Sequence, residues 1–201
     1  MALILMTGAA GGIGTGLRKL LPAIYPDLLL SDLKAPADLG KDEKFKAAEL
    51  SDLAQVEAIC EGVDGILHFG GYSVEGPWDA IHQSNIIGCY NLFEAARKKG
   101  VKRVVFASSN HAVGFYPRHH RIGTDVTARP DSRYGVSKVF GEATGALYSD
   151  KHGLGVTCLR IGNYGDQPLD HRRLSIWLKP EDLVQLCRIG PDHPDIQCEI
   201  F

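Results

Sequence analysis

The sequence predicts an α/β fold in which a doubly wound parallel sheet carries helices on both faces. Strand-length apolar runs alternate along the chain with longer segments of helical periodicity, which is the pattern of repeated strand–helix units. The runs are apolar throughout instead of alternating with polar residues, as expected of parallel strands that helices cover from both sides. With 201 residues and 44% apolar content, the chain can bury one good-sized core.

Five segments have the length and composition of buried strands, and a sixth is weaker. The five are 2–6 (ALILM), 27–31 (DLLLS), 65–70 (GILHFG), 101–107 (VKRVVFA) and 155–161 (GVTCLRI), and the weaker one is 45–50 (FKAAEL). The last residues, DIQCEIF, are expected to form a terminal strand.

Helical periodicity fills four of the intervals between these strands. The four helices are expected over 12–22, 52–62, 77–99 and 131–152. The third begins with Pro77, because proline is favoured as a first helical residue, and it ends before Gly100.

Charge and hydropathy argue against two classes of partner. The formal net charge is -2 and no run of lysine and arginine occurs, so we expect no nucleic acid. The apolar stretches are too short to span a bilayer, and no basic amphipathic helix is present, so we expect no membrane. The N-terminus lacks the basic flank and cleavage site of a signal peptide.

Cysteine and histidine usage points to a reducing compartment without a metal centre. The five cysteines form no CxxC pair and are odd in number, which favours buried, unpaired thiols and a cytoplasmic location. The eight histidines do not fall in metal-ligand spacing, and adjacent His119 and His120 would point in different directions. We expect no metal site.

A glycine-rich loop, TGAAGGIG, follows the first strand at residues 7–14. Gly8 permits the tight turn after the strand, Gly11 lets the backbone approach a pyrophosphate, and Gly14 lets the helix pack close to the sheet. The helix amides and dipole would then face the phosphates. Glycines also occur in ordinary turns, but this loop lies between a predicted strand and a predicted helix.

Asp32 ends the second strand, where the acid that binds the adenosine ribose is expected. The alternative is a solvated turn residue or a helix cap. An aspartate there would repel a 2′-phosphate, and neither Ser31 nor Leu33 supplies a cation to hold one. The sequence therefore predicts NAD as the cofactor in preference to NADP, with Lys34 as the nearby cation that argues against this choice.

The segment YGVSK, residues 134–138, places Tyr134 and Lys138 one helical turn apart. A phenol with a pKa near 10 is a poor base at neutral pH. A neighbouring ammonium favours the phenolate, so we expect Lys138 to lower the pKa of Tyr134. The alternative is a tyrosine and a lysine on an ordinary helix surface.

Four polar residues, SSNH at 108–111, follow the strand 101–107. They either close a polar turn or hold a polar ligand. Strand ends of open α/β sheets face the crevice where ligands bind, and the aromatic residues Phe115 and Tyr116 follow. We favour the ligand interpretation.

These residues together resemble the extended short-chain dehydrogenase/reductase family, of the NAD-dependent epimerase/dehydratase type. The resemblance is carried by TGxxGxxG at 7–14, Asn85 in a helix, Ser109 after a strand, and Tyr134 with Lys138. It implies a Rossmann fold with NAD bound at the glycine loop. It also implies that Ser109 orients the reacting oxygen, Tyr134 transfers the proton, Lys138 binds the nicotinamide ribose and tunes Tyr134, and Asn85 holds a relay water.

Longer segments resemble the bacterial uronate dehydrogenases within that family. They are residues 68–78, 85–97, 104–117 and 129–142. This resemblance implies a cytoplasmic oxidoreductase of carbohydrate metabolism that oxidises the anomeric hydroxyl of a hexuronic acid, such as glucuronate or galacturonate, to an aldarolactone, with Tyr134 as general base.

The expected ligand contacts follow from these comparisons of segments. Sugar-acid contacts are expected from Ser73, Ser109, Asn110, His111 and Tyr134, with Arg172 on the substrate carboxylate because its planar fork can donate two parallel hydrogen bonds. Adjacent Arg173 stays open as the alternative carboxylate ligand. Cofactor contacts are expected from Gly8, Gly11, Gly12, Ile13, Gly14, Asp32, Leu33, Glu49, Leu50, Gly70, Tyr134, Lys138 and Ile161.

Two departures from the uronate dehydrogenases keep other functions open. RIGNYG at 160–165 carries Asn163 and Tyr164, closer to a phrase of sugar-nucleotide epimerases and dehydratases, so an enzyme acting on a nucleotide sugar is the alternative. Relatives also continue beyond DIQCEIF. We therefore expect residues 1–201 to form a single NAD-binding domain, truncated at its C-terminus, with a small substrate-binding part at about 163–201.

A non-catalytic NAD-binding sensor is the third candidate. Such proteins usually lose the tyrosine or the lysine, whereas Ser109, Tyr134 and Lys138 are all present here. The intact trio favours an enzyme. Because the family often pairs the helices equivalent to 77–99 and 131–152 across a dimer, we also expect a homo-oligomer.

Overall fold

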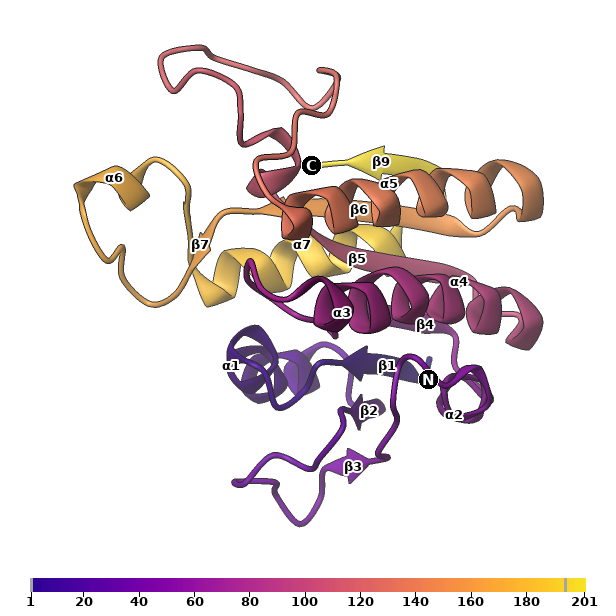
Figure 1. Cartoon of the computed structure of the whole chain (residues 1–201). Coiled ribbons are helices and arrows are strands. Elements are labelled where there is room, and N and C mark those ends of the chain that lie inside the picture. The colour runs from indigo at the N-terminus through magenta and orange to yellow at the C-terminus, as the bar shows by residue number, and fades with distance from the viewer. Residues whose placement is uncertain (1, 194) are drawn as a thin grey trace.

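Parallel strands form one central sheet in the computed structural model, which describes residues 2–193 and 195–201 (Figure 1). Across the sheet of the described residues the order is β3 (Lys44–Phe45), β2 (Leu28–Ser31), β1 (Ile4–Thr7), β4 (Gly65–His68), β5 (Arg103–Ser109), β6 (Gly155–Ile161) and β9 (Cys198–Ile200). The order reverses direction beside β1, so a crevice opens between the carboxyl ends of β1 and β4. The predicted doubly wound parallel sheet is confirmed.

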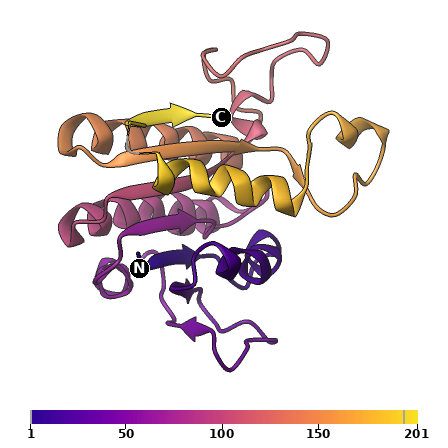
Figure 2. The ribbon, with the colours of Figure 1, turned by 180° about the vertical axis from the view of Figure 1, so that it is seen from behind.

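Helices cover both faces of this sheet. On one face α2 (Leu53–Ile59), α4 (Gly88–Lys99) and α5 (Arg133–His152) pack on a core that includes Phe93 and Phe106. On the other face α1 (Gly12–Leu20) and α7 (Pro180–Asp192) enclose a second core around Leu17 and Leu183, as Figure 2 shows from behind. The strands between them are buried on both sides, which explains their continuous apolar sequences.

The predicted strands match the structure closely, apart from the weakest one. Of the segment 45–50, only Phe45 pairs, with Lys44 before it, so β3 is a two-residue edge strand. The terminal segment does form a strand, since β9 pairs in parallel with β6. The predicted helix over 12–22 ends at Leu20 and continues as a short 3₁₀ turn, η1 (Leu21–Ala23).

The predicted helix over 77–99 is interrupted by a wider turn. It consists of α3 (Trp78–Ile81), a π-helical segment η2 (His82–Ile87) and α4. Pro77 lies one position earlier than expected, as the residue before the first turn. Gly100 ends the helix in the left-handed region at φ 72°, a conformation that glycine adopts at low cost. π-helical turns often occur at functional sites, and Asn85 lies in this one.

The segment 163–178 stands apart from the sheet at the carboxyl ends of the strands. There β7 (Asn163–Tyr164) and β8 (Trp177–Leu178) pair in parallel on either side of α6 (His171–Leu174), and Figure 1 shows this loop projecting beyond the sheet. The helix α7, which sequence analysis did not predict, and strand β9 then return to the main sheet. The helix α7 and the strand β9 therefore pack with the central sheet, unlike the segment 163–178.

The described cysteines carry free thiols. Four are buried, namely Cys60, Cys89, Cys158 and Cys187, and Cys198 is half-buried. No helix among the described residues combines the length and apolar character needed to cross a membrane.

Candidate active site

The glycine loop joins β1 to α1 with little room for side chains. Gly8 has φ +74°, and a Cβ there would lie 2.6 Å from the carbonyl carbon of Phe69. A Cβ on Gly14 would overlap the carbonyl oxygen of Gly8, so this glycine lets α1 cross closely over the loop. The first turn of α1 has no side-chain cap and no acidic residue. Its amide groups are therefore available for an anion.

Asp32 connects the end of β2 to this loop. Its carboxylate accepts hydrogen bonds from the backbone N–H of Ala10 at 2.9 Å and of Leu33 at 2.7 Å. A cavity of about 170 Å³ opens beside it. Among the residues on its wall are six of the expected cofactor contacts: Gly8, Asp32, Leu33, Glu49, Leu50 and Gly70. The strand ends thus bring together residues that are far apart in sequence.

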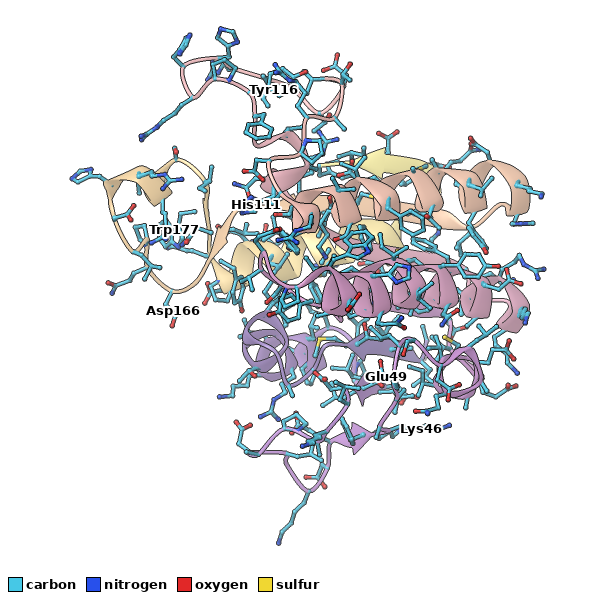
Figure 3. All side chains as sticks on the ribbon, viewed as in Figure 1. Lys46, Glu49, His111, Tyr116, Asp166 and Trp177 are labelled. Carbon is cyan, nitrogen blue, oxygen red and sulfur yellow. The ribbon has the colours of Figure 1, made fainter. Side chains whose placement is uncertain are left out.

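A second cavity of about 200 Å³ lies at the carboxyl ends of β5 and β6, beside the first turns of α5. Its wall holds eight of the expected site residues: Ile13, Ser73, Ser109, Asn110, His111, Tyr134, Lys138 and Ile161. Gly71 and Tyr72 line both cavities, so the two form neighbouring parts of one crevice. In Figure 3, His111 from the wall of the second cavity and Glu49 from the wall of the first are labelled at separate places in the molecule.

Tyr134 and Lys138 lie one turn apart on the inward face of α5. The Lys138 ammonium donates to the carbonyl oxygen of Ala107 at 2.7 Å and lies 5.4 Å from the centre of the Tyr134 ring. Complete burial lowers the pKa of Lys138 to about 8. The pair meets as the spacing predicts, and the lysine is anchored to the strand beside it.

The expected lowering of the Tyr134 pKa is wrong for the protein alone. Burial raises the pKa of the phenol above its usual value, and a hydrogen bond with Ser109 opposes this rise only in part. The physical reason is that removing the phenolate from water is costly, while the Lys138 ammonium is directed at Ala107 instead of the phenol oxygen. An ionised Tyr134 therefore requires a further favourable charge nearby.

The SSNH segment closes a polar turn, and three of its side chains line the cavity; that they bind a ligand stays a prediction. Ser109 Oγ accepts from the backbone N–H of His111 at 3.2 Å and so caps the 3₁₀ turn η3 (Asn110–Val113). The same turn presents Ser109, Asn110 and His111 to the cavity. Ser108 differs, because its hydroxyl donates to Glu142 at 2.5 Å inside the core. The turn therefore orients Ser109, Asn110 and His111 toward the cavity.

The comparisons with known proteins agree with this geometry. The model of the NAD dependent epimerase/dehydratase family matches residues 4–179. The chain belongs to that family. The uronate dehydrogenase of Pseudomonas putida is 45% identical over 195 residues, which are 96% of this chain and 72% of that protein. The resemblance to uronate dehydrogenases noted in the sequence is thus confirmed.

Solved structures of family members superpose closely. The glucuronic acid dehydrogenase of Chromohalobacter salexigens has a TM-score of 0.96 at 42% identity and covers 100% of this chain and 75% of its own. A uronate dehydrogenase variant from Agrobacterium tumefaciens, in complex with NAD, has a TM-score of 0.95 at 44% identity and covers 100% and 76%.

Asn85 has all of its side-chain hydrogen-bonding groups engaged with protein atoms. Its carbonyl oxygen accepts from the backbone N–H of Tyr72 at 2.6 Å, and its amide donates to Tyr72 O and to Ser137 Oγ, both at 2.9 Å. Ser137 in turn donates to the carbonyl of Tyr134 at 2.6 Å. Asn85 therefore ties the loop beside Ser73 to the helix of Tyr134. The expected role in holding a relay water stays a prediction, and both amide hydrogens already have acceptors.

Arg172 is the expected site residue that the structure keeps away from the others. It is exposed on α6 and lines neither cavity. Neighbouring Arg173 pairs with Asp170 at 3.2 Å, within the same helical turn. Leu169, Leu174 and Ile176 of the projecting segment are exposed and do not pack in the core. The assignment of Arg172 to the substrate carboxylate stays a prediction.

Sequence analysis missed three residues that hold the site in place. Glu75 accepts from the backbone N–H of Tyr134 at 3.0 Å, and Asp131 hydrogen-bonds His111. In the core, the Glu142 carboxylate accepts hydrogen bonds from the Ser108 hydroxyl and two from the Arg160 guanidinium. Glu142 follows Lys138 by one further turn, so helical spacing could have indicated it. The other two act across loops and leave no local signal.

Proposed function

We propose that this chain is a cytoplasmic, NAD-dependent oxidoreductase that oxidises the anomeric hydroxyl of a hexuronic acid, such as glucuronate or galacturonate, to an aldarolactone. The observation that carries the proposal is the meeting of Ser109, Tyr134 and Lys138 on one cavity wall, adjoining the cavity of the glycine loop. The close similarity to uronate dehydrogenases supports the choice of substrate.

The residues present fit NAD. The uncapped first turn of α1 offers amide groups to the diphosphate, and the close approach of Gly8 and Gly14 leaves no side chain in its way. Asp32 lies on the wall of the neighbouring cavity, where its carboxylate would bind the ribose hydroxyls and repel a 2′-phosphate. When bound, the cofactor supplies the acceptor for the hydride from the anomeric carbon.

Tyr134 accepts the proton of the anomeric hydroxyl in this mechanism. A positively charged oxidised nicotinamide bound near Tyr134 would favour its phenolate and so would offset the burial that raises the pKa of Tyr134. Ser109 hydrogen-bonds the phenol and would orient the same substrate oxygen. Lys138 would hold the nicotinamide ribose and keep a positive charge close to the phenolate.

The sugar would lie between the strand ends and the loop beside Tyr72. Ser73, Asn110 and His111 line this space and would bind its hydroxyl groups, whose pairing with buried polar groups gives selectivity. Arg172 would bind the carboxylate. Because α6 projects beyond the cavity, this contact requires the segment 163–178 to close over the bound sugar. We propose that this segment binds the substrate as part of the small region expected at about 163–201, and we propose a homo-oligomer for the assembly.

The test is an assay of NADH formation against glucuronate, galacturonate, neutral hexoses and UDP-sugars. We expect turnover of at least one uronate and at most weak turnover of neutral hexoses. Tyr134→Phe should lose at least about 1000-fold in kcat, since it removes the general base, while NAD affinity stays within about twofold by calorimetry. Unchanged behaviour of Tyr134→Phe, together with NAD binding but no turnover in the wild type, would support a sensor.

A nucleotide-sugar enzyme is the second candidate, and Asn163 with Tyr164 on β7 favours it. Tyr164 lines the cavity of Tyr134. Reaction with UDP-sugars alone in the same assay would replace the uronate proposal by this one.

A further inference from the structure

The carboxylate of Asp131 straddles one nitrogen of the His111 ring. Its two oxygens lie 2.8 and 3.1 Å from Nδ1. His111 follows β5, whereas Asp131 precedes α5 at the far end of the long loop 114–130. We infer that Asp131 is a positioning residue, which fixes the proton of the His111 imidazole on Nδ1 so that Nε2 accepts a hydrogen bond from a hydroxyl group of the sugar.

The tautomer follows from the donor inventory of the two groups. An ionised carboxylate has only acceptors, so a nitrogen within hydrogen-bond distance of both its oxygens has to carry the hydrogen. In a neutral imidazole the other nitrogen then has a lone pair. His111 lies on the wall of the cavity, and its Nδ1 is taken by Asp131. In the neutral ring, Nε2 is therefore the nitrogen that can accept a hydrogen bond from a ligand in the cavity.

The surrounding backbone is built around this pair. The backbone N–H of Asp131 donates to the carbonyl of His111 at 3.4 Å, and the hydroxyl of Ser132 donates to the Asp131 carboxylate at 3.0 Å. Gly114 leaves space for the carboxylate, because a Cβ there would overlap the Asp131 carboxyl carbon and one of its oxygens, Oδ2. Hydrogen bonds from Ser132 and from the backbone of Asp131 thus hold the carboxylate beside the His111 ring.

The His111 ring also packs against the ring of Tyr134. The ring centres are 5.6 Å apart, and the planes meet edge to face at 74°. A sugar whose anomeric hydroxyl reaches Tyr134 would therefore bring a neighbouring ring hydroxyl to His111. An acceptor there favours a hydroxyl hydrogen and rejects an ether or carbonyl oxygen, which has no hydrogen to give.

The sugar as the ligand of His111 rests on the proposed function, whereas the tautomer of the His111 ring does not. The tautomer is measured by ¹⁵N chemical shifts of His111 in labelled protein without substrate. We expect a protonated Nδ1 and an unprotonated Nε2 in the wild type, and a redistributed proton in Asp131→Ala. A wild-type spectrum with the hydrogen on Nε2 would overturn the inference, whatever the substrate.

The variant is expected to fold, because the side chains of His111 and Asp131 are 48% and 26% exposed and such pairs add little to stability. Asp125→Ala is the matched control, since it removes an exposed carboxylate from the same loop. Asp131→Glu should restore part of the wild-type spectrum. A change of tautomer in Asp125→Ala as large as in Asp131→Ala would contradict the specific role of Asp131.

Kinetics then connect the tautomer to the sugar. For the uronate that is oxidised, we expect Asp131→Ala to raise KM about 2- to 13-fold, the range for loss of one hydrogen bond. The kcat should change less than about threefold and the KM for NAD not at all, because proton transfer and cofactor contacts stay in place. If Asp131 had only a structural role, Asp131→Ala would lower the thermal midpoint without raising the KM for the uronate more than it changes kcat.

Deoxy analogues of the substrate identify the hydroxyl. For the analogue that lacks the hydroxyl bound by Nε2, the wild type and Asp131→Ala should have equal KM values. A KM ratio that stays the same for every deoxy analogue would overturn the inference. If no uronate is oxidised at all, the proposed function fails, and the ¹⁵N spectrum still decides the tautomer.

Discussion

The cavity of the glycine loop and the cavity of Tyr134 are lined by different kinds of residue. The first is formed mainly by backbone and small residues at the ends of β1, β2 and β4, with Gly8 and Gly70 on its wall. The second is lined by larger polar side chains from α5 and from loops, such as Asn110 and His111. Backbone geometry repeats wherever the strands have this order, whereas loop side chains depend on contacts that differ from chain to chain.

The two cavities, called the cofactor half and the substrate half below, therefore differ in how rigidly their residues are held. In the cofactor half, Asp32 is fixed by two backbone donors. In the substrate half, Arg172 projects from a short exposed helix outside the cavity. Substitutions in the first half should therefore act on the whole loop, and substitutions in the second should act on single contacts.

Gly14→Ala should have the largest effect. The new methyl group would overlap the backbone of Gly8 and Ala9, which cannot move without displacing α1 from the loop. We expect NAD affinity to fall at least 100-fold, more than about 2.7 kcal/mol, measured by calorimetry. Gly62→Ala is the control, because it adds a methyl group with nothing within 4 Å at a position outside both cavities. If Gly14→Ala binds NAD like the wild type, the cofactor half is less rigid than the structure implies.

Arg172→Ala tests the substrate half. Loss of a hydrogen bond to a charged carboxylate is worth about 1.5–3 kcal/mol, so we expect KM for the uronate to rise about 10- to 100-fold with NAD affinity unchanged. Arg173→Ala should stay within about twofold, because Arg173 already pairs with Asp170. A large effect in Arg173→Ala and none in Arg172→Ala would reverse the assignment.

His68 lies on β4, between the two halves, and should make stability depend on pH. It is buried against Thr7, with Nδ1 2.7 Å from the threonine hydroxyl, and burial together with nearby Lys138 lowers its pKa to about 3. Below its ordinary pKa of 6.5 the unfolded chain binds a proton that the folded protein does not, so stability falls as pH falls.

Between pH 7 and pH 5 this difference corresponds to a loss of about 2 kcal/mol in the free energy of unfolding. Urea denaturation at the two pH values measures it, with His68→Asn as the comparison. The variant should lose about 2 kcal/mol less over the same interval. Equal losses in both proteins would show that His68 accepts a proton in the folded state.

Asn85→Ala should have a smaller effect on function than Gly14→Ala or Arg172→Ala. The contacts of Asn85 hold the loop of Tyr72 against the helix of Tyr134, so we expect a fall of about 5- to 10-fold in kcat/KM from imperfect positioning. Ser137→Ala, which removes one of these contacts, should reproduce part of it. The solvent deuterium isotope effect should not change. A changed isotope effect would restore the relay role expected from the sequence.

What could be predicted from the sequence follows the same division. The glycine loop, the strand ends and the pairing of Tyr134 with Lys138 depend on local spacing, and all were expected. The π-helical turn around Asn85 and the carboxylate of Asp131 were not, because they depend on contacts between segments far apart in the chain. The pKa of Tyr134 was misjudged since burial depth is a property of the assembled fold.

The helix α5 carries Tyr134, Lys138 and Glu142 at successive turns of one inward face, all three buried. A helix of this length moves as a stiff rod, so the phenol and the ammonium keep their separation whenever the molecule flexes. The hydrogen bonds described above that hold Tyr134 come from Ser109, Ser137 and Glu75, and none comes from the segment 163–178. Changes of length or sequence in that segment should therefore alter contacts with the sugar while the Tyr134–Lys138 pair stays in place.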